Sequence, residues 1–163
     1  MEWDEYFVSM LYLVAMKSKD MKTQNATIIV DCFNRIKSTG YNSFPSGIND
    51  YVPERQERPE KYFWFEHGER NAIYNAAKNG VSLDRCKLYV TGIPCMDCAR
   101  GIVQSGIIEV IYHVLQPYES KIWEEHNKRT LVLFEEAGVK IREYTGSIVE
   151  HPFVRRDGKK IYV

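Results

Sequence analysis

The chain has 163 residues, of which 44% are hydrophobic and 27% charged, a composition typical of one compact globular domain. Its 22 basic and 22 acidic side chains cancel, so it lacks the basic excess of a general nucleic-acid-binding protein. No apolar run approaches the roughly 20 residues that span a bilayer, and the amino end is acidic where a secretory signal would be basic, so we expect a cytoplasmic protein with neither a membrane nor a nucleic-acid partner.

The first third of the chain predicts a helix, two strands and a loop. Apolar side chains recur at helical spacing over residues 3–18, which indicates an amphipathic helix. Residues 26–30 are short and rich in β-branched side chains, as in a buried strand, and residues 35–39 are expected to pair with them. Residues 40–60 carry Gly and Pro and show no clear period, and a loop of this length in a small domain is usually functional or disordered.

The rest of the chain alternates between helical and strand patterns. Helical spacing resumes over residues 67–79, and the elements expected after it are strand 87–91, helix 96–104, strand 109–115, helix 121–137 and strand 139–144. Such alternation favours an α/β layered domain. The basic cluster near the carboxyl end is interpreted as a solvated hairpin turning at Asp157-Gly158, with Arg155, Arg156, Lys159 and Lys160 beside the turn.

Cys95 and Cys98 form a Cys-x-x-Cys pair that follows a strand and a proline and begins a helix. Free N–H groups at a helix start stabilise thiolates, so the pair alone fits a redox site and a metal site about equally well. His67 also lies at a helix start, after the long loop. Two helix starts at one end of a sheet bring these three ligands together, which favours a metal site.

The remaining cysteines do not supply a clear fourth ligand. Cys86 begins the strand that ends near Cys95, and the length of that strand separates the two by roughly 15 Å or more. Cys32 lies in a turn between strands; it is not excluded, but it is interpreted as a small turn residue. Three protein ligands leave one position open, which is the arrangement of a catalytic zinc ion.

Glu69 then acquires a chemical role. A carboxylate beside zinc-activated water can accept its proton and deliver it to the substrate. By itself Glu69 would be interpreted as an acid favoured in the first turn of a helix. Together, His67-x-Glu69 and Pro94-Cys95-x-x-Cys98 form the signature of zinc deaminases of cytosine or adenine.

Over residues 3–144 the chain resembles the deoxycytidylate (dCMP) deaminases of the zinc-dependent cytidine deaminase superfamily. The resemblance is carried by the motifs WDEYF (3–7), SKD (18–20), GYNSFPSGIND (40–50), HGERNAI (67–73), LYVTGIPCMDCARGIVQSGI (88–107) and AGV (137–139). It implies a single deaminase domain, residues 1–163, with a central mixed β-sheet of about five strands flanked by helices. Residues 145–163, a tail or hairpin, lie beyond the match and have no functional interpretation.

The resemblance also implies a reaction and site residues. Zinc held by His67, Cys95 and Cys98 would activate a water to attack C4 of cytosine, with Glu69 moving the protons, so that dCMP becomes dUMP and ammonia. Asn42 would contact a sugar hydroxyl, and Lys19 and Tyr118 would lie near the phosphate or sugar. The alternatives are that Lys19 is a solvated helix end and that Tyr118 is an ordinary loop aromatic.

Regulation is the last implication. The resemblance suggests a homo-oligomer, expected to be a hexamer, that dCTP activates and dTTP inhibits, each bound with Mg²⁺. Gly47 and Asp50 would contact the triphosphate and Mg²⁺, and Lys78 would carry the signal to a neighbouring subunit. The alternative is that Gly47 and Asp50 only shape turns.

Two departures from the family pattern bear on these expectations. Gly68 replaces the usual Ala between the histidine and the acid, which loosens the backbone of the site. Asn25-Ala26-Thr27 replaces the usual Val-Gly-Ala, which can alter the pocket floor or the regulation.

Other substrates and functions also stay open. The substrate can be CMP, 5-substituted dCMP, a riboflavin-pathway intermediate or tRNA adenosine, although the neutral charge disfavours tRNA and the absence of a reductase domain disfavours the riboflavin pathway. A non-catalytic zinc or nucleotide-binding module leaves Glu69 without a role, and a redox protein leaves both His67 and Glu69 without one.

Overall fold

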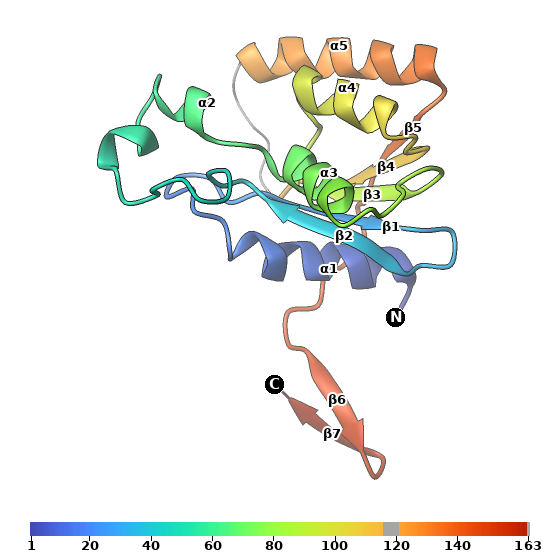
Figure 1. Ribbon diagram of the computed structural model, residues 1–163. Coiled ribbons are helices and arrows are strands. Elements are labelled where there is room, and N and C mark those ends of the chain that lie inside the picture. Colours follow the sequence, from blue (N-terminus) through green and yellow to red (C-terminus); the bar gives the residue numbers. More distant parts are fainter. Residues whose placement is uncertain (116–120, 163) are drawn as a thin grey trace.

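The structure, a computed structural model, describes residues 1–115 and 121–162 and is built on a five-stranded sheet (Figure 1). The strand order is β2-β1-β3-β4-β5, with bounds Ala26–Val30 for β1, Ile36–Tyr41 for β2, Lys87–Val90 for β3, Glu109–Tyr112 for β4 and Lys140–Glu143 for β5. β1 is antiparallel to both β2 and β3, whereas β3, β4 and β5 are parallel. The predicted mixed sheet of about five strands is confirmed.

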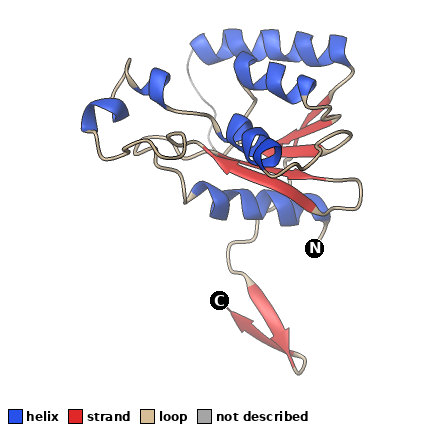
Figure 2. Cartoon of the chain, in the orientation of Figure 1, coloured by secondary structure: helices blue, strands red, loops and turns tan. Residues whose placement is uncertain are grey.

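Helices cover both faces of this sheet, so the chain has three layers (Figure 2). Helix α1 (Trp3–Ala15) packs on one face, and α3 (Gly68–Lys78), α4 (Met96–Gln104) and α5 (Lys121–Ala137) lie on the other. Alternation along the strands divides the core accordingly: on β1, Ile28 and Val30 face α1, while Ile29 faces α3 and α4. None of the described helices is long and apolar enough to cross a bilayer.

Several element ends differ from the sequence prediction. The first helix ends at Ala15 rather than at residue 18, because the chain turns there and Ser18 Oγ accepts from Asp20 N at 3.1 Å. The predicted loop 40–60 is not wholly irregular: a 3₁₀ turn, η1 (Pro53–Gln56), begins at a proline, and a short helix, α2 (Lys61–Trp64), follows it. Periodicity could not reveal elements this short.

Two glycines let α3 lie unusually close to the sheet. A Cβ on Gly40 of β2 would come within 2.2 Å of the Gly68 carbonyl oxygen and 2.4 Å of Ala72 N. A Cβ on Gly68 would lie 3.3 Å from the Ala26 backbone. The sequence suggested that Gly68 loosens the backbone of the site, but the structure shows that it does not. It is the first residue of a regular helix whose start is pressed against β1 and β2, and that start carries His67 as its N-cap.

The chain ends in a two-stranded antiparallel hairpin, β6 (Phe153–Arg156) and β7 (Lys159–Tyr162). Asp157 and Gly158 both have positive φ, 49° and 77°, as a tight hairpin turn requires. The connection from β5 is anchored on α1, where Val149 N donates to Ser9 Oγ at 2.9 Å. Beyond that point the hairpin projects away from the sheet on the α1 side (Figure 1).

Candidate metal centre and substrate cavity

His67, Cys95 and Cys98 meet where α3 and α4 begin. His67 and Cys95 are the N-cap residues of the two helices, and Cys98 lies in the first turn of α4. His67 Nδ1 is 3.5 Å from Cys95 Sγ and 3.6 Å from Cys98 Sγ, and all three ligand atoms lie within 4.8 Å of one another. A tetrahedral zinc ion, about 2.3 Å from sulfur and about 2.05 Å from nitrogen, would separate S from N by about 3.6 Å. The three side chains therefore fit a zinc ion.

The thiols are poised to bind a cation. Hydrogen bonds from the Cys98 thiol and from His67 lower the pKa of Cys95 to about 3. The same hydrogen bond to Cys95, together with burial, raises the pKa of Cys98 well above its usual value. Arg70 Nη1 lies 3.7 Å from Cys98 Sγ and can donate to it, while Arg70 also pairs with Glu66. A bound metal favours deprotonation of the second thiol as well.

Glu69 lies beside this centre but outside the ligand group. The residue is 6% exposed, it lines the same cavity as His67 and Cys95, and its carboxylate is not among the three clustered ligands. Burial raises the pKa of Glu69, opposed in part by the charge of His67. A raised pKa makes the Glu69 carboxylate a better proton acceptor than an ordinary glutamate, which is a property that a proton shuttle needs.

The metal centre opens into a cavity of about 380 Å³, a size within the range of small-molecule sites. Its walls come from the turn after α1, the α2 segment, the loop after β3, and the first turns of α5. Apolar and aromatic side chains form much of the wall, including Phe65, Val90, Ile93, Tyr112 and Trp123. Among the polar residues of the wall, four are joined by hydrogen bonds into one cluster, which we call the polar end of the cavity: Asp20, Thr23, Asn25 and Asn42.

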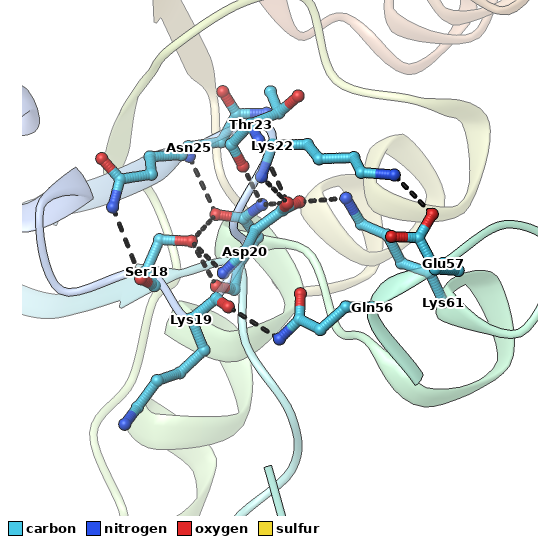
Figure 3. Close-up of polar contacts among 11 residues, drawn as sticks. Ser18, Lys19, Asp20, Lys22, Thr23, Asn25, Gln56, Glu57 and Lys61 are labelled. Carbon is cyan, nitrogen blue, oxygen red and sulfur yellow. Dashed lines mark hydrogen bonds and ion pairs between the residues drawn. The ribbon is translucent and has the colours of Figure 1, made fainter. Parts of the chain in front are cut away.

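Asn42 lines the cavity, and protein atoms satisfy its amide completely. Its Oδ1 accepts from Ser18 Oγ at 2.5 Å and from Asn25 N at 2.8 Å. Its Nδ2 donates to Asp20 Oδ2 at 3.0 Å and to Thr23 O at 2.6 Å. Figure 3 shows the contacts that converge on Asp20 in this network. The network fixes the orientation of Asn42, and its contact with a sugar hydroxyl stays a prediction.

Asp20 also joins this network to α2. Its Oδ2 forms an ion pair with Lys61, whose side chain is 13% exposed against 3% for that of Asp20. Lys22 pairs with Glu57 at 2.5 Å, and Gln56 Nε2 donates to Lys19 O at 3.0 Å (Figure 3). The segment that carries η1 and α2 is thus held to the turn after α1 by polar contacts.

The other predicted residues that the structure describes do not line the cavity. Lys19 is not among the residues that line the cavity; its Nζ pairs with Asp50 at 3.1 Å. Gly47 has φ 85° with open space around it, and Lys78 is an exposed residue at the end of α3. Tyr118 lies outside the described residues. The roles assigned to these five positions, Asp50 included, stay predictions.

Sequence reasoning missed the two cations on the cavity wall, Arg58 and Lys61. Arg58 belongs to the stretch 40–60, in which no period is visible, and Lys61 follows that stretch directly. It also missed Asp20 as an individual residue, although the motif SKD contained it, and Arg70, which stands inside HGER. Membership in these two motifs was the signal that could have pointed to Asp20 and Arg70.

The chain is similar to known proteins in both sequence and fold. The family model of the cytidine and deoxycytidylate deaminase zinc-binding region matches residues 1–114. Mouse deoxycytidylate deaminase is 37% identical over 150 residues, covering 89% of this chain and 81% of that protein, and the human deoxycytidylate deaminase is 36% identical over 149 residues, covering 88% and 80%. The crystal structure of the dCMP deaminase from cyanophage S-TIM5, in complex with dCMP and dUMP, matches in fold with a TM-score of 0.70, at 24% identity over 86% of this chain and 96% of that one.

Proposed function

The chain belongs to the zinc-binding cytidine and deoxycytidylate deaminase family, and from this premise we propose that it hydrolyses dCMP to dUMP and ammonia. The observation that carries the proposal is the convergence of His67, Cys95 and Cys98 on one point of a cavity wall, with the buried carboxyl of Glu69 beside it. A purely structural zinc site would take a fourth protein ligand and would need no buried acid.

Zinc, when bound by these three residues, would supply a water activated near neutral pH. Glu69 would accept a proton from that water as its oxygen bonds to C4 of cytosine, and would deliver the proton to N3. It would then carry a second proton to the 4-amino group as the C4–N bond breaks and ammonia leaves. The apolar wall formed by Val90, Ile93 and Trp123 would hold the base and exclude competing water.

A monophosphate substrate is supported by the charges on the cavity wall. Arg58 and Lys61 both line it, and a guanidinium or ammonium group binds phosphate through charge-assisted hydrogen bonds. Lys61 also offsets the carboxylate of Asp20, which would otherwise repel the phosphate. Lys19 pairs with Asp50 away from the cavity lining, so Arg58 and Lys61 are the better candidates for the phosphate contact.

The sugar would lie against the polar end of the cavity. Asn42 is held there by four hydrogen bonds to protein atoms, which supports its proposed place beside a sugar hydroxyl as part of a rigid wall. Asn25, which departs from the family pattern, lines the same end.

Regulation and assembly form a separate part of the proposal. We propose a homo-oligomer, on the family pattern a hexamer, activated by Mg·dCTP and inhibited by Mg·dTTP. The ion pair between Lys19 and Asp50 supplies a cation and a carboxylate, and Gly47, three residues before Asp50, has an open left-handed backbone whose N–H could face a triphosphate. Saturation curves for dCMP without effector and with each triphosphate test this: hyperbolic curves that neither triphosphate moves would remove regulation and leave catalysis standing.

The reaction is tested by following ammonia release from the purified protein with dCMP, CMP, 5-methyl-dCMP, deoxycytidine and adenosine nucleotides. We expect the highest kcat/KM with dCMP. Equal values for dCMP and deoxycytidine would remove the phosphate site, and no ammonia from any cytosine compound by the zinc-loaded protein would overturn the deaminase assignment. The four cysteines are free thiols, in keeping with the reducing, cytoplasmic setting we propose.

A further inference from the structure

Few contacts with the rest of the described chain stabilise the β6–β7 hairpin. Its four apolar side chains are largely exposed: Phe153 42%, Val154 57%, Ile161 46% and Tyr162 65%. A two-stranded hairpin in water is marginally stable at best, and it usually needs a third element to cover one face. The hairpin therefore has the properties of an arm that is completed by a partner.

The charges of the hairpin also indicate a partner, and they predict the sign of the charge on the partner surface. The register places Arg155 opposite Lys160 and Arg156 opposite Lys159, so both pairs nearest the turn are like-charged. Like charges directly opposite each other destabilise a sheet pair. Acidic groups on a partner surface would relieve this repulsion, so the arm calls for a surface that is apolar and acidic.

The outer face of α1 has this character. Trp3, Tyr6, Leu13 and Met16 are 54%, 40%, 65% and 69% exposed, although the opposite side of the same helix is fully buried in the core. A helix that is apolar on both sides is normally covered on both sides. The helix has acidic residues in its first turn and no Lys or Arg, and Glu2 and Glu5 form no ion pair within the described part of the chain.

We propose that the β6–β7 hairpin of one copy of the chain packs on the outer face of α1 of a second copy. The dimensions agree: four residues of strand span about 13 Å, and the helix from Trp3 to Leu13 spans about 15 Å. The charged and apolar groups also match in position along the two elements if the hairpin tip points toward the amino end of α1. Its cations then approach Glu2 and Glu5, and its apolar base covers Leu13.

The geometry favours a second copy over the hairpin's own α1. The connection crosses α1 at Ser9 and Val149, and the hairpin then projects outward, leaving its own face of α1 exposed (Figure 1). The whole chain has a net charge of zero, and residues 153–162 carry four basic residues and one acidic residue, so the remainder carries a net −3. A second copy thus supplies charge complementarity as well as the matching apolar face. This inference rests on the self-association proposed above and gives it a physical contact.

Sedimentation velocity of the full chain and of two variants tests the contact. The first variant ends at Glu150, which keeps the anchor on α1; among the residues it removes, 151–162 are all exposed. The second, Leu13→Glu, places a charge on the outer face of α1; Phe33→Glu, at a 72% exposed apolar side chain of the β1–β2 turn, is its matched control. We expect both variants, but not the control, to weaken self-association by about tenfold or more.

A mixture of the two variants is the sharpest arm of the experiment. The shortened chain keeps an intact α1 face and the Leu13→Glu chain keeps an intact hairpin, so mixing them restores one hairpin-on-helix contact and should produce heavier species than either variant alone. A full chain that sediments as a monomer would overturn the inference. A shortened chain that forms the same oligomer as the full chain, with the same number of copies, would overturn it as well. The inference also fails if the hairpin retains a labelled oligonucleotide while the chain stays monomeric.

Ammonia release measured on the same samples separates this inference from the proposed reaction. An inactive oligomer that depends on the hairpin would leave the contact standing and remove the reaction. An active monomer would do the reverse.

Discussion

Arg58→Gln tests whether the cavity is built for a nucleoside monophosphate. Arg58 lines the cavity and forms no ion pair within the described residues, so its removal leaves no buried charge unpaired. Lys61 is less suitable as a probe, because Lys61→Gln would strip the nearly buried Asp20 of its partner and cost about 3–5 kcal/mol of folding free energy.

The expected size of the effect follows from the exposure of Arg58. A charge-assisted hydrogen bond contributes about 1.5–3 kcal/mol, and Arg58 is an exposed residue at the cavity wall, where solvent screening places it at the lower end. We therefore expect kcat/KM for dCMP to fall about tenfold, with no change for deoxycytidine. Arg58→Lys, which keeps the charge, should recover part of the loss.

Arg55→Gln is the matched control for this measurement. Arg55 lies three residues away, stacks over Trp64 at 3.7 Å and donates to Asn49 O at 2.9 Å, but it does not line the cavity. Rates for both substrates at low and high salt complete the assay, since a phosphate contact at the surface weakens with ionic strength. The reasoning fails if Arg58→Gln slows dCMP and deoxycytidine equally, or if Arg55→Gln reproduces its effect.

Three further predictions concern the metal, the acid and a buried hydroxyl group of β1. Cys95→Ser should lower the zinc content from about one per chain to a small fraction, whereas Cys32→Ser, at an exposed cysteine, should keep it; metal analysis that finds equal zinc in both variants would contradict the ligand set. Glu69→Gln should keep zinc and fold but lose about 10⁴ in kcat, and a near wild-type rate would reduce Glu69 to a helix-start acid. Thr27→Val should raise the free energy of unfolding by about 1–2 kcal/mol in urea titrations, because Thr27 Oγ1 is buried with no hydrogen-bond partner among the described residues; a loss of stability would mean that a bound water or ligand satisfies it.

The metal centre was predictable because its ligands stand at the starts of helices. A cap position is set by local sequence, and the residues that flank His67 and Cys95 signal a helix start without any knowledge of tertiary contacts. The separation of the two motifs by strand β3 then places both starts at one end of the sheet. The sheet itself followed from short β-branched runs, and its order could not be read from them.

The part of the cavity wall that carries Arg58 and Lys61 was less predictable for the opposite reason. Arg58 and Lys61 belong to a segment whose conformation depends on contacts with the turn after α1, such as the pair between Lys22 and Glu57. No local pattern encodes contacts of this kind between distant segments. The same limit applies to Gly68, which looked like a loosened backbone until its neighbour across the interface, Gly40, was known.

Asp20 connects Asn42 and Lys61, two residues of the cavity wall, in one electrostatic unit. A carboxylate that is 3% exposed is costly unless it is paired, and here Lys61 and the amide of Asn42 both satisfy Asp20 Oδ2. The residue that orients the wall proposed for the sugar therefore also holds the cation proposed for the phosphate. Because contacts within the protein order these groups and balance their charges, a nucleotide would not have to organise them on binding, and more of its binding free energy would be available to bring C4 of the base to the metal centre.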